Sequence, residues 1–343
     1  MNIEQGISLR PYNTFHIEAI ADHFVKVTNE TELIDSIQTA HANNLEIYVI
    51  GGGSNILLTK DIHGLVILNE IKGIDILYED DDVVHVKFQG GENWHECVMW
   101  CVEHNLGGIE NLSLIPGTMG AAPIQNIGAY GVELKDVLVE VEAIEIKTGK
   151  KHIFSHDACH FGYRNSIFKL GQNGRYIILS VILRLSKNPV YNTSYGTIKE
   201  ELELMGVHEL SLLAVSEAVI RIRKSKLPDP TILGNAGSFF KNPTIAEDKF
   251  EQLRKWHPTI PGYKNEDGIK VPAAWLIEHS HPENATSWKG YRDRNYGVHE
   301  KQALCLVNYS DASGSDIFSL SERIITSVQQ AFNILLEREV NIW

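Results

Sequence analysis

Cysteine is scarce in this sequence: the 343 residues contain four, and none of them forms a Cys-x-x-Cys pair. This usage argues against a disulfide framework and favours a reducing compartment. The first residues, Met1–Gln5, also lack the basic start and apolar run of a secretory signal. Together these absences predict a cytoplasmic protein.

Positive charge is also in short supply, with 31 Lys and Arg against 44 Asp and Glu and a formal net charge of −13. This balance disfavours general nucleic-acid binding, although a local basic patch can still hold a phosphorylated small molecule. The hydrophobic content of 43% and the charged content of 22% are ordinary for a soluble globular protein. A chain of this length is expected to fold into two or three domains.

The most distinctive stretch is Ile115–Gly131, which carries no charge and is rich in glycine and alanine. Pro116 and Pro123 interrupt it, and it is too short and too polar for a membrane helix, so no membrane insertion is expected. Glycine lets the main chain approach a ligand closely, and oriented amides form concave anion sites. The stretch therefore suits an anion or the edge of a flat ring, with a buried turn-rich loop as the alternative.

A second glycine turn, Gly51–Asn55, directly follows the predicted strand Ile47–Ile50. A dinucleotide fold of the Rossmann type would need Gly-x-Gly-x-x-Gly opening a helix. Here the third glycine is missing and the strand-like Ile56–Thr59 follows, so the Rossmann interpretation is weak. A phosphate-binding turn between strands, with Ser54 and Asn55 as polar donors, remains open.

Hydrophobic periodicity predicts mixed helices and strands along the chain. Asn29 is expected to cap a helix that buries Leu33. The other predicted helices are Glu92–Asn105, Ser216–Lys226, Ala246–Trp256, Pro272–Ser280 and Ser315–Leu336, the last with Leu335 facing inward. The other predicted strands are Val66–Leu68, Val83–Phe88, Val137–Ile146, Ile177–Leu185 and a short closing strand at Glu337–Val340.

Two clusters invite a chemical interpretation. Cys97, Cys101 and His104 share one helix face, but no second ligand pair matches them, so we expect buried cysteines and no metal. The helix that ends at Lys226 carries Arg223 in its last turn. Basic residues there serve either as partners of the helix dipole or as ligands of a diphosphate.

Three segments, Gly51–Asn55, Ile115–Gly131 and Gly234–Pro243, have to be explained together. As an ordered set they resemble the UDP-N-acetylenolpyruvoylglucosamine reductase family, over about Asn13 to Val340. The resemblance implies an α+β flavin-binding fold of the vanillyl-alcohol oxidase type, with two α+β subdomains and a C-terminal α/β substrate-binding domain. The expected boundaries are 1–70 joined by 337–343, then 71–214, then 215–336.

The resemblance also implies FAD as the cofactor and NADPH as the hydride donor. Gly51–Asn55 holds no histidine that could tether the flavin, so FAD is expected to be noncovalent. The implied diphosphate-binding residues are Gly52, Gly53, Ser54 and Asn55. The implied flavin-lining residues are Pro116, Gly117, Gly120, Ala121, Gln125, Asn126, Gly128 and Ala129.

The family's reaction reduces UDP-N-acetylglucosamine enolpyruvate to UDP-N-acetylmuramate during peptidoglycan precursor synthesis. Hydride reaches C3 of the enolpyruvyl group and a proton must then reach C2. By resemblance, Ser238 is the proton donor, Arg164 stabilises the developing carboxylate charge and Glu339 assists enol stabilisation. The implied substrate-binding residues are Tyr195, Arg223, Lys226, Asn242 and Gln302, with Tyr195 marking the family's first type.

The chain departs from the family pattern at Arg338, where proline is common, and at Asn341, where arginine is common. The expected partners are the UDP-sugar and NADPH, and a monomer is expected. Two other functions compete: a sugar or alcohol oxidase of the same flavin fold, and a nucleotide-binding module without activity. The oxidase leaves Gly234–Pro243 unexplained, and the module gives Arg164, Ser238 and Glu339 no shared purpose.

Overall fold

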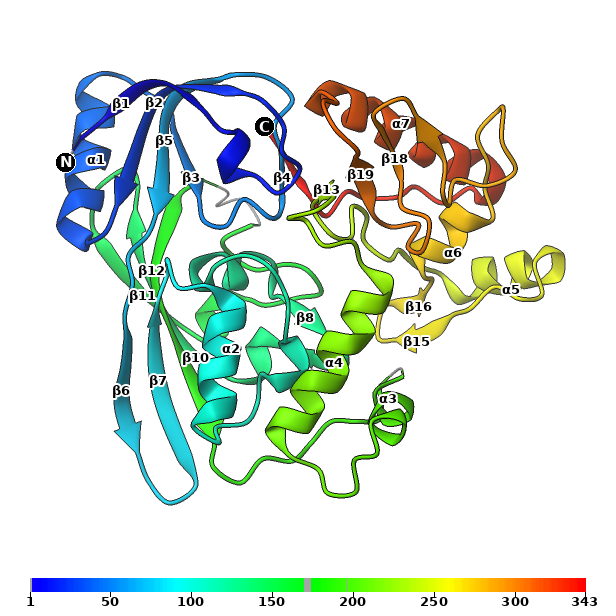
Figure 1. The fold of residues 1–343 in the computed structure, drawn as a ribbon, viewed down its shortest axis with the longest axis horizontal. Coiled ribbons are helices and arrows are strands. Elements are labelled where there is room, and N and C mark those ends of the chain that lie inside the picture. The colour runs from blue at the N-terminus through cyan, green and yellow to red at the C-terminus, as the bar shows by residue number, and fades with distance from the viewer. Residues whose placement is uncertain (1, 170–173, 196) are drawn as a thin grey trace. The chain divides into compact units, whose positions relative to one another are not determined.

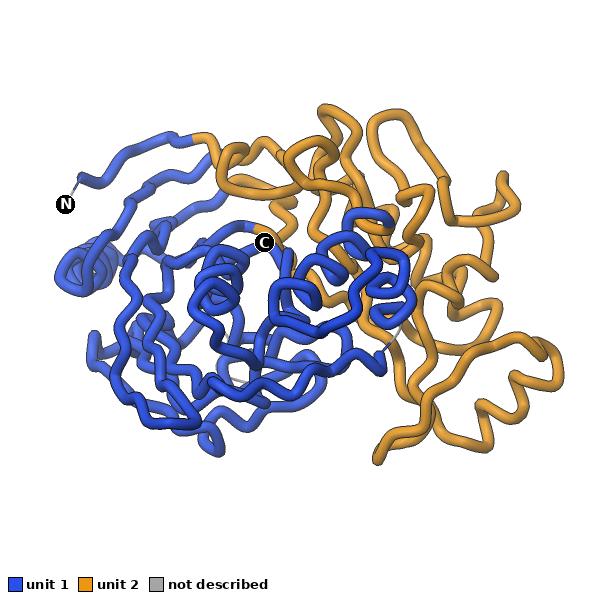
Figure 2. The backbone as a smooth tube through the Cα atoms, turned by 60° about the horizontal axis from the view of Figure 1, so that its bottom comes forward, with its two compact units in different colours: residues 1–7, 20–53, 62–225 blue, residues 8–19, 54–61, 226–343 orange. Residues whose placement is uncertain are grey.

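The computed structural model describes residues 2–169, 174–195 and 197–343 (Figure 1). The chain divides into two compact units, coloured separately in Figure 2. Unit 1 comprises Met1–Ile7, Ile20–Gly53 and Ile62–Ser225, and unit 2 comprises Ser8–Ala19, Ser54–Asp61 and Lys226–Trp343. The chain passes between them several times, so unit 2 combines two short segments of the first 61 residues with the C-terminal part of the chain.

The first sheet of unit 1 has the strand order β1-β2-β5-β3. Its strands are β1 Glu4–Ser8, β2 Ile20–Val27, β3 Ile47–Ile50 and β5 Ile62–Asn69, and β5 pairs in parallel with both β2 and β3. Helix α1, Glu30–Ala42, connects β2 to β3 and buries Leu33 and Ile37. Crossover by a helix is the usual way to join parallel strands.

The second sheet of unit 1 is antiparallel, with the order β11-β10-β12-β7-β6. Its strands are β6 Ile74–Glu79, β7 Val83–Gln89, β10 Leu138–Glu145, β11 Lys151–Ser155 and β12 Tyr176–Ser186. Val84, Val86 and Phe88 of β7 alternate into a core that also holds Trp94 and Val98 of helix α2, Trp94–Glu103. The alternation is typical of a sheet with one covered face.

Short elements connect these parts of unit 1. They are η2 Glu110–Leu112, η3 Met119–Gln125, β8 Gly128–Ala129, β9 Val132–Glu133, η4 Leu134–Asp136, η5 Asp157–Cys159 and helices α3 Ile198–Leu204 and α4 Leu212–Lys226.

Unit 2 is built from small sheets and three helices. A four-stranded sheet has the order β13-β19-β18-β17, from β13 Gly234–Asn235, β17 Arg292–Asp293, β18 Tyr296–Val298 and β19 Leu306–Asn308. A three-stranded sheet contains β14 Thr244–Ile245, β15 Tyr263–Asn265 and β16 Gly268–Lys270, and β4 Ile56–Leu57 pairs in parallel with β20 Asn341–Ile342. The helices are α5 Glu247–Trp256, α6 Ala273–Glu278 and α7 Gly314–Phe332, and a short turn of helix, η1, spans Arg10–Tyr12.

Most elements predicted from periodicity are confirmed, but the last two differ. Helix α7 ends at Phe332 because Asn333 takes a left-handed backbone conformation with φ +53°. Leu335 therefore lies beyond the helix and is 67% exposed, so the prediction that it faces inward is wrong. The predicted strand at Glu337–Val340 is reduced to an isolated antiparallel bridge between Arg338 and Phe240, and regular pairing begins only at Asn341.

Cys97 and Cys101 of helix α2 are buried in the core, as expected for small apolar side chains. Among the described residues, no helix is long and apolar enough to cross a membrane, and no group of three or more His, Cys, Asp or Glu side chains is arranged to hold a metal. The division into 1–70 with 337–343, 71–214 and 215–336 stays a prediction.

Candidate active site

The two glycine segments singled out in the sequence meet within unit 1. A Cβ atom added to Gly52 would lie 2.8 Å from Cα of Gly117, and one added to Gly51 would lie 2.2 Å from Oγ1 of Thr118. Backbone therefore packs directly on backbone, which only glycine allows at these positions. The contact brings together the predicted diphosphate loop and the predicted flavin-lining segment.

The flavin-lining segment is anchored along one side. The Trp94 amide donates to the Gly117 carbonyl at 3.1 Å, and the Gly120 amide donates to the Gly90 carbonyl at 2.8 Å. Met119 is fully buried, whereas Pro116 and Ala121 are exposed. The segment thus presents a surface of small residues and main chain while its other side is fixed in the core. Such a surface fits the close approach of FAD.

Asn126 fixes the far end of this segment. It has a left-handed backbone with φ +47° and is fully buried. Its Nδ2 donates to Glu133 Oε2 at 3.0 Å and to the Gly162 carbonyl at 3.2 Å, and its Oδ1 accepts from the Lys135 amide at 3.0 Å. The side chain of this predicted flavin-lining residue is therefore engaged inside the protein.

Arg164 lies at the tip of a tight turn. Gly162 and Asn165 exchange backbone hydrogen bonds of 3.0 and 3.2 Å across it, and Arg164 itself has φ +52°. Its guanidinium donates to the Gly128 carbonyl at 2.7 Å. A non-glycine residue at positive φ is strained, and such strain is often kept at functional sites. The predicted catalytic arginine is thus hydrogen-bonded to the predicted flavin-lining segment.

Helix α4 carries Arg223, whose positive charge acts on two side chains of unit 1, Tyr130 and His95. The rings of Tyr130 and Tyr195 meet edge to face with centroids 6.5 Å apart. Burial raises the pKa of Tyr130, and the positive charge of Arg223 opposes that rise. The pKa of His95 is lowered, first by burial and then by Arg223. Tyr195 and Arg223 were predicted from the sequence, whereas Tyr130 and His95 were not.

A neutral His95 also explains its hydrogen bond. The amide of Leu114, a residue with φ +59°, donates to Nδ1 of His95 at 3.0 Å. A ring nitrogen can accept a hydrogen bond only in the neutral imidazole. The sequence signal for this group was weak, because His95 and Tyr130 stand far apart in the chain.

Ser238 lies in unit 2, directly after strand β13. A Cβ atom on Gly234 would lie 2.5 Å from the Phe15 carbonyl oxygen, so glycine is needed where the strand passes that loop. Gly237 has φ +67°, and its amide donates to Oδ1 of Asn235 at 2.9 Å. After Ser238 the chain turns inward, and the fully buried Phe239 donates its amide to the Leu304 carbonyl at 2.8 Å.

Glu339 lies beside the Ser238 segment in the same unit. Its amide donates to the Phe239 carbonyl at 2.8 Å. The side chain of Asn55 donates to the Glu339 carbonyl at 3.4 Å, and the amide and side chain of Asn341 both donate to the Asn55 carbonyl, at 3.1 and 3.0 Å. Unit 2 therefore brings Ser238, Glu339 and the end of the predicted diphosphate loop together.

The two departures from the family pattern have structural roles. Arg338 donates to Ser321 Oγ at 2.8 Å, pairs with Glu322 and lies over the Phe318 ring at 4.6 Å. It thereby fastens the chain before Glu339 to helix α7, while Asn341 fastens the chain after it to Asn55. Arg164 belongs to unit 1, so its assembly with Ser238 and Glu339 stays a prediction.

The other predicted substrate residues of unit 2 are Asn242, Gln302 and Lys226. Asn242 Oδ1 accepts from the Ala273 amide at 2.9 Å, at the start of helix α6. The side-chain oxygen of Gln302 accepts from the Leu304 amide at 3.3 Å, and its backbone carbonyl accepts from the Cys305 amide at 3.0 Å. The Leu304 carbonyl of this turn accepts from the Phe239 amide. Lys226 is exposed at the end of helix α4.

Comparison with known proteins decides the family. The chain is 48% identical to the UDP-N-acetylenolpyruvoylglucosamine reductases of Amoebophilus asiaticus, over 100% of this chain and 99% of that protein, and of Flavobacterium johnsoniae, over 100% of both. The chain belongs to the UDP-N-acetylenolpyruvoylglucosamine reductase family. The family's C-terminal domain matches residues 229–343, and an FAD binding domain matches residues 21–155.

A solved structure supports the fold of the reductase family independently. The crystal structure of UDP-N-acetylenolpyruvylglucosamine reductase from Thermus caldophilus covers 100% of this chain and 99% of its own, with a TM-score of 0.69 and 24% identity. The predicted family and the predicted α+β flavin-binding fold with a further C-terminal domain are confirmed. The first-type assignment from Tyr195 stays a prediction.

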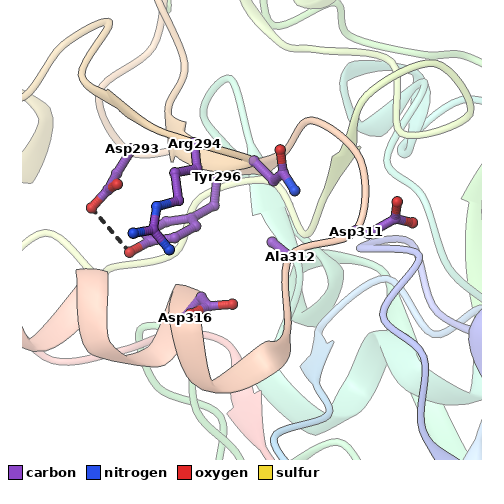
Figure 3. Close-up of a pocket in the computed structure, with 7 residues that line it drawn as sticks. Asp293, Arg294, Tyr296, Asp311, Ala312 and Asp316 are labelled. Carbon is purple, nitrogen blue, oxygen red and sulfur yellow. Dashed lines mark hydrogen bonds between the residues drawn. The ribbon is translucent and has the colours of Figure 1, made fainter.

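A cavity in unit 2, of about 340 Å³, is lined by none of the residues predicted for the active site (Figure 3). Its acidic side chains already have protein partners. Asp293 accepts from the Tyr296 hydroxyl at 3.2 Å, Asp311 pairs with Arg10 at 3.1 Å, and Asp316 accepts from the Ser313 amide at 2.9 Å at the start of α7. Nothing in this cavity points to a particular ligand.

Proposed function

We propose that this chain is an FAD-dependent reductase that uses NADPH to convert UDP-N-acetylglucosamine enolpyruvate into UDP-N-acetylmuramate, for peptidoglycan precursor synthesis. The full-length identity of 48% to two reductases of this name carries the proposal. The backbone contact between Gly52 and Gly117 supports it, because it joins two segments that the flavin site requires.

FAD would be held by the main chain of the two glycine segments. Gly52, Gly53, Ser54 and Asn55 would bind its diphosphate, since backbone amides in turns form anion sites. The flavin ring would lie against the segment that contains Pro116, Gly117, Gly120, Ala121, Gln125, Asn126, Gly128 and Ala129, with the buried Asn126 holding the segment from inside. When bound, FAD supplies hydride transfer from NADPH to C3 of the enolpyruvyl group.

Arg164 would bind the enolpyruvyl carboxylate as its negative charge grows. A guanidinium offers a planar pair of donors that matches a carboxylate. Its hydrogen bond to the Gly128 carbonyl supports this role, because the anchored side chain needs little rearrangement during reaction.

Ser238 would donate a proton to C2, and Glu339 would stabilise the enol. A serine hydroxyl is a weak acid, so its position relative to the basic carbon has to be tightly set. The left-handed Gly237 before it and the buried Phe239 after it support such a fixed position. The backbone bond from Glu339 to Phe239 supports a shared task for the two residues.

The UDP-sugar would be bound by Lys226, Arg223, Tyr195, Asn242 and Gln302. Lys226 and Arg223 share the last turn of α4 and would bind the diphosphate. Tyr195 is 58% exposed, which supports a tyrosine that closes over substrate, as in first-type members. We further propose a cytoplasmic monomer with the domain division 1–70 with 337–343, 71–214 and 215–336.

Anaerobic mixing tests this function. The purified protein should be yellow, NADPH should bleach the flavin band, and the enolpyruvyl UDP-sugar should restore it. A flavin that oxygen restores quickly while the enolpyruvyl substrate does not would instead favour an oxidase. A colourless protein that cannot be reconstituted with FAD would contradict both enzymes.

A further inference from the structure

Asn235 is a buried side chain with an unusually organised set of bonds. It is 4% exposed and makes three hydrogen bonds through its carboxamide. Oδ1 accepts from the Gly237 amide at 2.9 Å, while Nδ2 donates to the carbonyls of Leu233 at 2.8 Å and Pro228 at 3.3 Å. One neutral group thus links three points of the chain around Ser238.

The acceptor side of this carboxamide sets the turn before Ser238. Gly237 has φ +67°, and a Cβ placed on it would have no atom within 4 Å, so glycine is favoured here by its backbone conformation and not by a close contact. The bond from its amide to Asn235 holds this conformation. The Asn235 backbone is itself held, since its amide donates to the Thr14 carbonyl at 2.9 Å and its carbonyl accepts from Thr14 Oγ1 at 2.6 Å.

The donor side of the carboxamide reaches the loop that follows helix α4. That helix ends at Lys226, two residues before Pro228. The Nδ2 bonds to Pro228 and Leu233 therefore tie the start and the end of this loop to the turn of Ser238. A shift of the chain near Lys226 would be passed to Ser238 through a single side chain.

We propose that Asn235 is a positioning residue that sets the place of the Ser238 hydroxyl and couples it to the chain that follows Lys226. The inference rests on the proposed function, in which Ser238 donates a proton and Lys226 binds the diphosphate. In this proposal Asn235 acts through Ser238 and through the chain after Lys226, and not by binding substrate or flavin itself.

Two substitutions separate the two sides of the carboxamide. Asn235→Ala removes both the acceptor and the donors. Because misplacing a reacting group by about 1 Å slows a reaction on the order of 100-fold, reoxidation of the reduced flavin by saturating substrate should slow by about 100-fold. Asn235→Asp keeps the acceptor for Gly237 and loses the donors, so this rate should stay within about fivefold of wild type while substrate affinity falls by about tenfold. Flavin reduction by NADPH should be unchanged in both.

Asn13 provides a matched control in the same unit. It is also 4% exposed and makes three side-chain hydrogen bonds, donating to the carbonyls of Leu9 and Ile17 and accepting from the Ile17 amide. Asn13→Ala should lower the unfolding temperature about as much as Asn235→Ala. It should leave the substrate-dependent rate within about threefold of wild type, because the bonds it removes lie within a different loop.

A double-mutant cycle with Ser238→Ala gives the decisive readout. If Asn235 acts through Ser238, adding Asn235→Ala to Ser238→Ala causes no further loss of the substrate-dependent rate. Multiplied losses would overturn the inference. Hydrogen exchange of peptides covering 234–240, measured without substrate, should show one faster amide in Asn235→Ala and none in Asn235→Asp; equal exchange in all variants would also overturn it.

The outcomes also separate this inference from the proposed function. If the substrate does not reoxidise wild-type enzyme, the proposed function fails and the positioning role fails with it. If wild type and Ser238→Ala behave as expected but Asn235→Ala keeps full activity, the positioning role alone fails.

Discussion

Replacing Gly52 with alanine tests whether the two glycine segments must touch for the flavin to bind. The new Cβ would lie 2.8 Å from Cα of Gly117, whereas carbon atoms in contact are at least about 3.5 Å apart. The two backbones would therefore have to separate by about 0.7 Å. No positive φ is required at Gly52, so the added methyl group brings no backbone strain besides this contact.

The expected loss follows from the cost of overpacking. Forcing an extra methyl group into a close contact costs about 1–3 kcal/mol, which is about a 5- to 150-fold loss in affinity if FAD requires the segments in contact. Titration of the apoprotein with FAD, followed by flavin fluorescence, measures that affinity directly. Thermal unfolding of the same apoprotein reports the structural cost separately.

Gly64→Ala is the control for this experiment. Its Cβ would lie 2.4 Å from the Glu46 carbonyl oxygen, an equally severe contact in unit 1 that involves no predicted flavin segment. We expect Gly64→Ala to unfold at a lower temperature but to keep FAD affinity in its folded form. If Gly52→Ala loses stability yet binds FAD as tightly as wild type, the contact between the segments is not part of the flavin site.

Three further outcomes are expected. Ser238→Ala should slow substrate-dependent flavin reoxidation by about 10²- to 10⁴-fold in stopped-flow absorbance and leave reduction by NADPH near normal, whereas equal loss in both steps would contradict proton donation. Lys226→Ala should weaken UDP-sugar binding by roughly tenfold in calorimetry, and unchanged affinity would remove its diphosphate role. Burial raises the pKa of Cys97 and of Cys159 to about 12 and that of Cys101 well above its usual value, so all three thiols should resist alkylation at pH 8 until the protein unfolds; rapid labelling of native protein would refute this.

The sequence predicted local elements well wherever side-chain periodicity determines them. Helix α2 buries Trp94, Val98 and Cys101 as its 3.6-residue spacing requires, and β7 alternates as a strand with one covered face requires. The glycine segments were predicted to let the main chain approach a ligand; the structure shows close approach between their backbones, and the ligand contact stays a prediction. In each case the information lies in neighbouring residues and needs no knowledge of distant contacts.

The pairing of strands that lie far apart in the sequence could not be predicted from local patterns. The closing strand was predicted at Glu337–Val340, yet the structure pairs Asn341–Ile342 with β4, Ile56–Leu57, which lies far away in the sequence. Strand propensity depends mainly on what the strand packs against, and that partner cannot be read locally. The prediction that Leu335 faces inward was wrong for a related reason. Asn333 ends helix α7 before the pattern of apolar residues ends.

Asparagine side chains that take no part in the reaction form hydrogen bonds to the backbone beside the predicted catalytic residues. The Asn126 side chain donates to the carbonyl that opens the turn of Arg164. The Asn235 side chain accepts the amide directly before Ser238. Both carboxamides are at least 96% buried, where a charged side chain would be costly to place.

The same arrangement recurs at the third predicted catalytic residue, where Asn55 donates to the carbonyl of Glu339 and Asn341 donates back to Asn55. A carboxamide donates and accepts at once without charge, so it can join two backbone segments that run in different directions. Aspartate in its place keeps the acceptor and loses the donor, whereas alanine loses both. A catalytic group on an irregular segment therefore depends on a neighbouring asparagine, and the geometry of Arg164, Ser238 and Glu339 should be sensitive to these amides even though none of them reacts.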